Sequence, residues 1–382
     1  MHYILRLLLL FSVSLLTGAV PAKNATVWIG MSSPRNGERE GIYRTTLDVE
    51  TGELAPPALA AEIKAPGFLT VSPDSKKLYS TCQLADGKPG VAAFEIGNDG
   101  ATLSPLNTQP TGDGEACFAT TDRSGKSLFT AQYGNGSVAG FPIDADGRIQ
   151  GRSALVKHAG SGVDKSRQDG PHPHSTNVDP TNRFVMVPDL GIDQVVIYEF
   201  DPATAKLTRH GFGKSPSGAG PRHMKFHPNG RFAFVVNELD LSVTAFAYDS
   251  QKATLHEVQT ISTLPKAMRE VTCTCSEIRV HPNGRFLYAA NRGHDSIAAF
   301  SVEPETGKMT FIERESIRGS HPRNFNIDPT GKWLLVAGRD SNTVSVFRID
   351  ESSGGLIYAE RAINSPSPIC IEFQGEGLGA GG

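Results

Sequence analysis

One phrase recurs along this chain of 382 residues at intervals of roughly fifty residues, and it constrains the fold more than any other feature. The clearest copies occupy residues 221–237 and 276–291, and both contain His-Pro-Asn-Gly-Arg. Weaker copies share the same turn, so six turn positions can be aligned: Pro73, Arg123, Pro180, Pro228, Pro282 and Pro329. A period in this range predicts an array of repeated structural units.

Each copy has the pattern of strand, turn and strand. Apolar Met224 and Phe226 alternate with polar residues before the turn, which indicates a strand of period two. Proline and glycine then supply the backbone angles of a tight turn. The dense apolar run at residues 232–236 suits a strand buried on both faces, and a third and a weaker fourth strand follow. Four antiparallel strands per unit predict the blade of a β-propeller.

The two chain ends supply a seventh unit beyond the six complete copies. Residues 368–373 resemble a first strand without a continuation, and residues 25–30 resemble a second strand without a first. Pairing them closes the ring and leaves no exposed terminal edge. We therefore expect an all-β, seven-bladed propeller that forms a single domain over residues 23–382.

Residues 1–22 differ from the rest of the chain. A basic start, a short apolar stretch and small residues at Val20 and Ala22 predict a signal peptide, with an uncleaved N-terminal anchor as the alternative. We expect an exported protein, periplasmic or secreted, without stable membrane association after cleavage. The formal net charge of -3 argues against a nucleic-acid partner, which would favour a basic face.

Five cysteines are present, and an odd number leaves at least one thiol unpaired. Cys273 and Cys275 are close enough in sequence to pair or to bind a metal, although most cysteines of propellers are small buried apolar residues, which is the favoured interpretation. The remaining cysteines are Cys82, Cys117 and Cys370.

The aligned copies also locate the mouth of the central channel, where the inner strands begin and the second strands end. Charged and imidazole side chains concentrate at these positions: His174, Arg222, His223, Glu238, Glu277, Arg292, Arg323 and Arg339. Arginine holds a carboxylate or phosphate through paired hydrogen bonds, and histidine and glutamate transfer protons. The pattern predicts a cleft for a small anionic substrate, with ordinary solvated loop charges as the alternative.

Four segments resemble a known family in order and in content. Residues 167–175 read Arg-Gln-Asp-Gly-Pro-His-Pro-His-Ser, residues 187–193 read Val-Pro-Asp-Leu-Gly-Ile-Asp, and residues 220–223 and 236–239 complete the set. This set is similar to the seven-bladed lactonases, which include propeller-type 6-phosphogluconolactonase and carboxymuconate lactonizing enzyme.

The resemblance implies a catalytic set of His174, Arg222, Glu238 and Arg292. The residues expected to bind substrate are His172, which otherwise shapes its loop, together with His223, Glu277, Arg323 and Arg339. Asp189 either orients a neighbour or caps a turn.

The resemblance implies that the protein opens a sugar lactone with water. Two alternatives stay open: a lactonizing activity of the carboxymuconate type, and a non-catalytic propeller that binds a ligand or a protein. Convergence of the catalytic set would favour an enzyme, whereas scattering around the rim would favour binding. We expect a monomer without a cofactor. We also expect no metal, because His172 and His174 are too few ligands to specify zinc.

Overall fold

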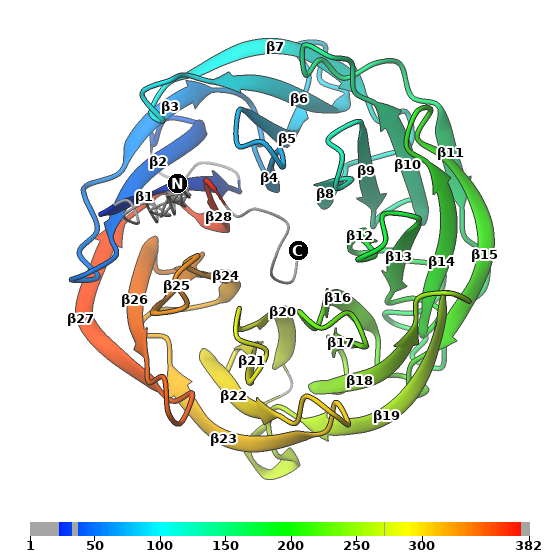
Figure 1. Cartoon of the computed structure of the whole chain (residues 1–382), viewed down its shortest axis with the longest axis vertical. Coiled ribbons are helices and arrows are strands. Elements are labelled where there is room, and N and C mark those ends of the chain that lie inside the picture. The colour runs from blue at the N-terminus through cyan, green and yellow to red at the C-terminus, as the bar shows by residue number, and fades with distance from the viewer. Residues whose placement is uncertain (1–22, 33–36, 271, 376–382) are drawn as a thin grey trace, which may run out of the picture.

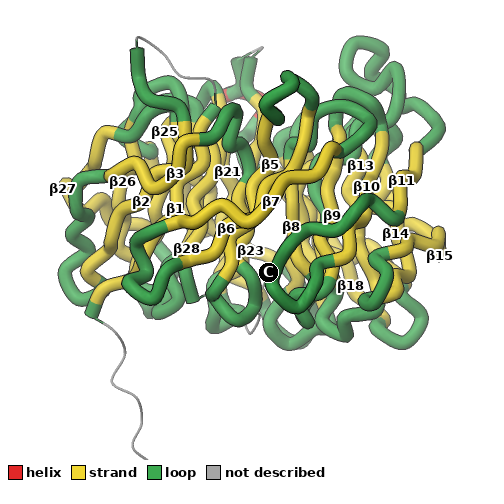
Figure 2. The backbone as a smooth tube through the Cα atoms, turned by 90° about the horizontal axis from the view of Figure 1, so that it is seen from above, coloured by secondary structure: helices red, strands yellow, loops and turns green. Residues whose placement is uncertain are grey.

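The computed structural model describes residues 23–32, 37–270 and 272–375. Twenty-eight strands form seven four-stranded antiparallel sheets, which are arranged as blades around a central channel (Figure 1). Seen from the edge, the molecule is a disc with loops on both faces (Figure 2). The seven-bladed propeller predicted from the repeat is confirmed.

The strands are numbered along the chain, and each blade is given from the channel outward. Blade 1 contains β28 (Pro368–Phe373), β1 (Asn24–Met31), β2 (Gly41–Asp48) and β3 (Ala58–Glu62). Blade 2 contains β4 (Leu69–Val71), β5 (Lys77–Gln83), β6 (Pro89–Ile96) and β7 (Leu103–Pro110). Blade 3 contains β8 (Phe118–Thr121), β9 (Ser127–Gln132), β10 (Ser137–Pro142) and β11 (Ala154–Lys157). Blade 4 contains β12 (Asn177–Val178), β13 (Phe184–Asp189), β14 (Gln194–Asp201) and β15 (Lys206–Lys214).

The remaining three blades follow the same order. Blade 5 contains β16 (Pro221–Phe226), β17 (Phe232–Asn237), β18 (Ser242–Asp249) and β19 (Thr254–Ser262). Blade 6 contains β20 (Thr274–Val280), β21 (Phe286–Arg292), β22 (Ser296–Val302) and β23 (Met309–Ser316). Blade 7 contains β24 (Pro322–Ile327), β25 (Trp333–Gly338), β26 (Thr343–Ile349) and β27 (Leu356–Asn364). A 3₁₀ turn, η1 (Lys266–Met268), lies between blades 5 and 6.

Blade 1 closes the ring with strands from both chain ends. β28 pairs antiparallel with β1, and Ile29 lies opposite Ile371 in this register. The predicted union of the two termini is therefore confirmed. It ties the first and last segments of the ring together through backbone hydrogen bonds.

The two His-Pro-Asn-Gly turns, in blades 5 and 6, each contact the following blade through the histidine. His281 accepts a hydrogen bond on Nδ1 from the backbone N–H of Asn283 at 3.2 Å, and its Nε2 donates to the carbonyl of Gly331 in blade 7 at 2.8 Å. Gly331 has a φ of +78°, and a Cβ there would lie 2.7 Å from His281 Cε1. The glycine thus meets both a conformational and a steric requirement.

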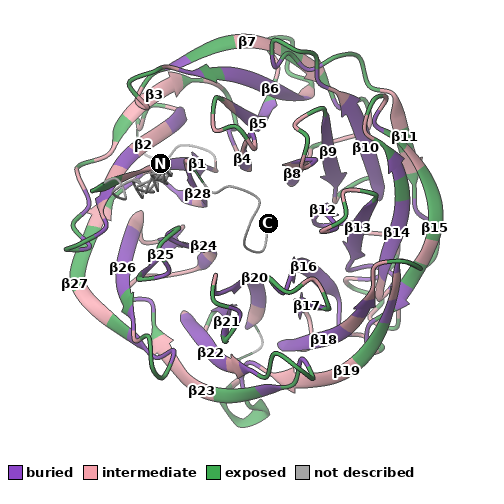
Figure 3. Ribbon diagram, viewed as in Figure 1, coloured by how far each residue is buried: buried purple, intermediate pink, exposed green. Residues whose placement is uncertain are grey.

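Neighbouring blades pack against each other through apolar side chains, and the outer edge of each blade is polar. The cluster between blades 5 and 6 joins Phe234 and Val236 to Leu287 and Phe300, all fully buried. Exposed and half-buried residues are common in the outermost strands, whereas the second and third strands are largely buried (Figure 3). The apolar runs identified in the sequence therefore form the contacts between blades.

Bulges occur where several inner strands leave the channel mouth. In β16 the register shifts between Pro221 and His223, so Arg222 is the extra residue. In β24 the shift between Pro322 and Asn324 makes Arg323 the equivalent residue. Bulges re-aim side chains, and here the same backbone device directs two arginines toward the channel.

The predicted signal peptide, residues 1–22, lies outside the described residues and stays a prediction. No helix among the described residues is long and apolar enough to span a membrane. All five cysteines are free thiols, and Cys273 and Cys275 are both buried.

Candidate active site

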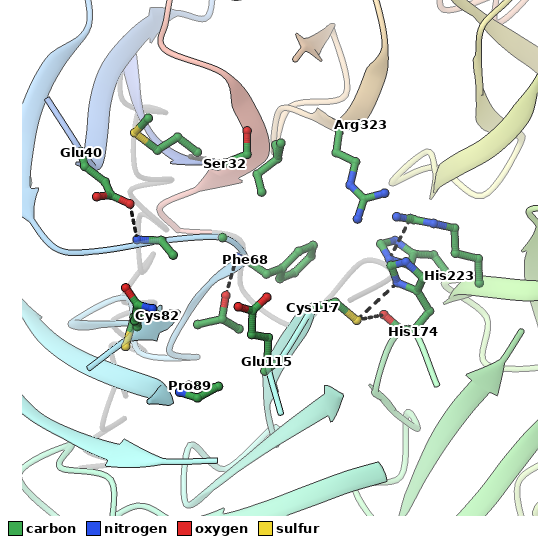
Figure 4. Close-up of a pocket in the computed structure, with 18 residues that line it drawn as sticks. Ser32, Glu40, Phe68, Cys82, Pro89, Glu115, Cys117, His174, His223 and Arg323 are labelled. Carbon is green, nitrogen blue, oxygen red and sulfur yellow. Dashed lines mark hydrogen bonds between the residues drawn. The ribbon is translucent and has the colours of Figure 1, made fainter. Parts of the chain in front are cut away.

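A cavity of about 370 Å³ opens at the channel mouth and is bounded by several blades. One wall carries Arg222, Arg323, His174 and His223. Figure 4 shows Phe68 between this wall and a second side that carries Ser32 and Glu40. Thr81, Gln83 and Glu115 also line the cavity. The cavity is therefore basic on one side and acidic or neutral on the other.

Glu238, directly after β17, is the carboxylate that holds three arginines in place. Its Oε2 lies 2.8 Å from Arg222 Nε and 3.1 Å from Arg292 Nη2, and its Oε1 lies 2.6 Å from Arg167 Nη2. Burial opposes ionisation of Glu238, but the charges of Arg292, Arg222 and Arg167 outweigh it and hold the pKa of the carboxyl well below its usual range. Glu238 is therefore an ionised anchor at every physiological pH.

Two of these arginines are also tied to backbone carbonyls. Arg222 Nη1 donates to the carbonyl of Ser276, and Arg292 Nη2 donates to the carbonyl of Cys275 at 2.8 Å. The combined contacts fix both guanidinium planes. Preorganised donors of this kind stabilise charge that develops during a reaction.

His174 lies just before β12 and lines the cavity beside Arg222. Its Nδ1 is 3.6 Å from Cys117 Sγ, and its ring meets the His223 ring edge-on at 5.2 Å between centroids. Burial, reinforced by the positive charge of Arg222, lowers the pKa of His174 well below its ordinary value of 6.5. The imidazole is therefore neutral at physiological pH and available to accept a proton.

His223 links Arg222 to a deeper carboxylate. Arg222 Nη1 lies 3.0 Å from His223 Nε2, and His223 Nδ1 lies 3.0 Å from Glu277 Oε1. Because a guanidinium can only donate, Nε2 must accept and Nδ1–H must donate to Glu277. Burial lowers the pKa of His223 to about 3 despite the opposing charge of Glu277, which agrees with this neutral tautomer.

The comparisons with known proteins agree with this architecture. Residues 26–373 match the model of the family described as "Lactonase, 7-bladed beta-propeller". The chain belongs to the seven-bladed β-propeller lactonase family.

Individual relatives in this lactonase family cover nearly the whole chain. The 6-phosphogluconolactonase of Bacillus subtilis is 35% identical over 91% of this chain and 99% of its own length. The structure of the periplasmic gluconolactonase of Pseudomonas aeruginosa is 28% identical and has a TM-score of 0.86, covering 92% of this chain and 99% of its own. The structure of a Bacteroides fragilis protein is 34% identical with a TM-score of 0.85, covering 93% of this chain and 99% of its own.

The lactonase fold brings the expected catalytic set together. Arg222, Glu238 and Arg292 form one ion-paired cluster, and His174 shares the cavity wall with Arg222. The four side chains come from blades 4, 5 and 6 and converge at the mouth rather than scattering around the rim. Alignment of the sequence copies placed them at equivalent positions, and Glu238 joins Arg222 and Arg292, with His174 beside Arg222 on the cavity wall.

The residues expected to bind substrate occupy different places. His223 and Arg323 line the cavity. Glu277 is fully buried behind His223 and pairs with Arg279 Nη1 at 2.8 Å. Arg339 does not line this cavity, and its Nε donates to Asp340 Oδ1 at 2.8 Å.

His172 and Asp189 organise the loop that carries His174. The backbone N–H of His172 donates to Asp189 Oδ1 at 2.7 Å, and the His172 ring stacks on Tyr133 at 4.5 Å. Asp189 Oδ2 lies 2.6 Å from Nδ1 of the fully buried His158 side chain. These contacts support an orienting role for Asp189. Asp189 also caps a turn, because its Oδ1 accepts the backbone N–H of Gly191 at 2.9 Å.

Two residues of the cluster were not singled out from the sequence. Arg167 lies in the long loop between β11 and β12, and Tyr133 follows β9, with its hydroxyl 3.3 Å from Arg167 Nη2. Arg167 belongs to no repeat copy, so alignment of the blades could not find it. Its place at the start of the Arg-Gln-Asp-Gly-Pro-His-Pro-His segment was the available signal. No group of three or more His, Cys, Asp or Glu side chains suited to hold a metal occurs in the described part of the chain.

Proposed function

We propose that this protein hydrolyses a sugar lactone at the mouth of its channel. The observation that carries the proposal is the Glu238-centred cluster beside His174, which presents fixed positive charge and a neutral imidazole to one cavity. The names of the Bacillus and Pseudomonas relatives, a 6-phosphogluconolactonase and a periplasmic gluconolactonase, support a sugar lactone as the substrate class.

The reaction begins with water on the cavity side of His174. The imidazole accepts a proton while the water oxygen forms a bond to the lactone carbonyl carbon. Arg222 faces the carbonyl oxygen and stabilises the negative charge that develops there. The ring C–O bond then breaks, and protonated His174 returns the proton to the leaving alkoxide. The product is the open hydroxy acid, and the protein is restored.

Glu238 acts in this scheme as a positioning residue. Its two oxygens are occupied by guanidiniums from Arg167, Arg222 and Arg292, and it does not line the cavity. No oxygen of Glu238 therefore faces the substrate, whereas its charge keeps three arginines together. We therefore assign proton transfer to His174 and electrostatic support to Glu238.

The predicted export signal makes the periplasm the proposed location. The Pseudomonas relative is named a periplasmic gluconolactonase, which is consistent with a substrate outside the cytoplasm. A fusion of residues 1–22 to a periplasm-dependent reporter tests this point. Reporter activity equal to that of a version without residues 1–22 would contradict export.

The activity itself is tested with a panel of lactones that includes gluconolactone, its 6-phosphate and an aromatic-degradation lactone. Ring opening is followed by acid release at constant pH, with spontaneous hydrolysis subtracted. We expect catalysis of at least one sugar lactone and a loss of orders of magnitude in Arg222→Ala. Rates unchanged in both Arg222→Ala and Glu238→Gln would overturn the site assignment.

A further inference from the structure

Cys117 differs from the other four cysteines of the chain in its exposure. The other four are buried, whereas Cys117 is partly exposed and lines the cavity together with His174. It directly precedes β8 in blade 3, and its backbone N–H donates to the carbonyl of Ala131 at 2.9 Å. Figure 4 shows its side chain directed toward His174, which belongs to the neighbouring blade 4. The thiol therefore lies beside the imidazole to which we assign proton transfer.

The sulfur of Cys117 is surrounded by one ring nitrogen and three carbonyl oxygens. Sγ lies 3.6 Å from His174 Nδ1 and 3.4 Å from the carbonyl oxygen of His174. The carbonyl oxygens of Ala131 and Pro173 lie at 3.5 Å and 3.9 Å. A thiol is a weak donor through its S–H and a weak acceptor through its sulfur. The thiol can therefore donate to a carbonyl and accept from the imidazole at the same time.

The thiol of Cys117 is protonated at physiological pH. Burial raises its pKa to about 11, although the positive charges of Arg222 and Arg323 act in the opposite direction. Only the thiolate is an effective nucleophile, so a thiol of this kind does not attack a carbonyl. His174 is also neutral, because burial and the charge of Arg222 lower its pKa. The pair is therefore a neutral thiol beside a neutral imidazole.

The two tautomers of a neutral imidazole use these contacts differently. If Nδ1 of His174 carries the proton, Nδ1–H donates to Sγ and the thiol donates to a carbonyl oxygen. If Nε2 carries the proton, the thiol donates to Nδ1 and the carbonyl contacts receive no proton. The first arrangement makes two hydrogen bonds and the second makes one. The surroundings of Cys117 therefore favour the tautomer of His174 that is protonated at Nδ1.

The other ring nitrogen of His174 is left for the cavity. His174 is only 4% exposed and lines the cavity, and its Nε2 makes no hydrogen bond within the described part of the chain. A general base must present a bare nitrogen to the proton that it removes. Nε2 meets this requirement only when Nδ1 holds the proton of the neutral ring. The tautomer thus decides whether His174 can act on water.

We propose that Cys117 is a positioning residue that holds His174 in the Nδ1–H tautomer, so that Nε2 accepts the proton of the attacking water. This inference rests on the proposed lactone hydrolysis and assigns its proton transfer to one atom. Nε2 takes the proton while the water oxygen bonds to the carbonyl carbon. When the ring C–O bond breaks, Nε2–H returns the proton to the alkoxide. The thiol keeps its own proton throughout, and Nδ1–H stays directed at Sγ.

Two substitutions test this role by kinetics. Cys117→Ala removes the sulfur, whereas Cys117→Ser keeps an atom that both donates and accepts hydrogen bonds. Cys370→Ala is the matched control, since Cys370 is a fully buried thiol on β28 in blade 1 that accepts the backbone N–H of Leu69 at 3.4 Å. Steady-state constants are measured with a lactone that the wild-type protein hydrolyses, and urea unfolding is measured for each variant.

We expect Cys117→Ala to lower kcat about 10- to 100-fold, as for a misplaced catalytic group, with KM changed less than threefold. Cys117→Ser should restore kcat to within about threefold of the wild-type value, and Cys370→Ala should leave it unchanged even if it is equally destabilised. Unchanged kcat in Cys117→Ala would overturn the proposal. Loss of all catalysis in both Cys117 variants would also overturn it, because the thiol would then act as a nucleophile.

The tautomer itself is measured in the wild-type protein without a substrate. The nitrogen chemical shifts of isotopically labelled histidine rings distinguish protonated from bare ring nitrogens, and the His174 signals are identified by their absence in His174→Gln. We expect a protonated Nδ1 and a bare Nε2 at neutral pH, and a mixture of tautomers in Cys117→Ala. A protonated Nε2 in the wild-type ring would overturn the proposal. Absence of turnover with every lactone would instead overturn the proposed function, because this measurement does not depend on turnover.

Discussion

Arg222 Nε donates to Glu238 Oε2 at 2.8 Å, and this buried contact defines how the arginines of the mouth are held. Glu238→Gln keeps the shape and removes the charge that Arg167 and Arg292 also share. We expect kcat/KM to fall about 100-fold or more, as for the loss of a preorganised electrostatic group. The free energy of unfolding should fall by about 3–5 kcal/mol, because buried guanidiniums lose their partner.

The pH profile of Glu238→Gln also tests whether Glu238 positions the arginines or accepts the proton. If Glu238 is the anchor, the residual activity of Glu238→Gln keeps the acid limb of the pH profile. Loss of that limb in Glu238→Gln would instead make Glu238 the proton acceptor. Glu199→Gln, an exposed position on β14, is the control for the charge change and should match the wild-type protein in urea unfolding and in kinetics.

The pH dependence of catalysis should follow His174. Its pKa is lowered well below 6.5, first by burial and then by Arg222, so the imidazole stays neutral as the pH falls through 6.5. We expect kcat/KM to be level between pH 8 and pH 6.5 and to fall only at lower pH, measured by acid release or by a coupled assay. An acid limb centred above pH 6.5 would contradict the assignment of His174 as the base.

Replacement of His174 by Gln should lower kcat by about 10²–10⁴, the usual contribution of general base catalysis. His210→Gln, at an exposed position on β15, is the matched control and should leave kcat unchanged. Full activity in His174→Gln would show that water is activated elsewhere in the cavity.

The fold was predictable because each repeat copy contains local strand and turn patterns that can be recognised in the sequence. The alternation at Met224 and Phe226, the turn residues and the unpaired strand patterns at both ends each indicate the same propeller. Local patterns that agree with one another define a fold well. The ring closure through Ile29 and Ile371 needed only the observation that two half-blades were left over.

The candidate site was only partly predictable, and the reason is spatial. Alignment of the copies found Arg222 and Arg323, since both occupy the same bulge position in different blades. It could not show that Glu277 lies behind His223, because a mouth position in sequence does not reveal which side chain faces the cavity. Arg167 reaches Glu238 from an irregular loop that has no counterpart in other blades.

Stability should decline between neutral and mildly acidic pH because two imidazoles are held neutral. His223 has a pKa of about 3 in the folded protein, lowered mainly by burial, and His174 is shifted in the same direction. The unfolded chain binds protons at these histidines below about pH 6.5, whereas the folded chain does not. The stabilisation is therefore complete above pH 6.5 and is lost as the pH falls toward 3.

Urea unfolding at pH 7 and pH 5 measures this effect. We expect a loss of about 1–2 kcal/mol for each of the two histidines over this interval, before the carboxylates begin to titrate. Glu238 and Glu277 have lowered pKa values, so their contributions are present above about pH 4.5 and are lost only under stronger acid. His223→Gln should reduce the difference between the two pH values, and an unchanged difference would contradict the neutral tautomer.

The contact between His281 and Gly331 should contribute to stability without affecting catalysis. His281→Ala removes the donation to the Gly331 carbonyl and the acceptor for Asn283 N–H, and it leaves a cavity between blades 6 and 7. Lost hydrogen bonds and a cavity of this size predict a decrease of about 2–4 kcal/mol in the free energy of unfolding, measured in urea. Because the turn lies at the opposite end of its strands from the channel mouth, kcat/KM at 25 °C should stay within twofold of the wild-type value.

His256→Ala, exposed on β19, is the control and should change stability by less than about 0.5 kcal/mol. Equal stabilities of the two variants would show that the turn histidine does not join the blades.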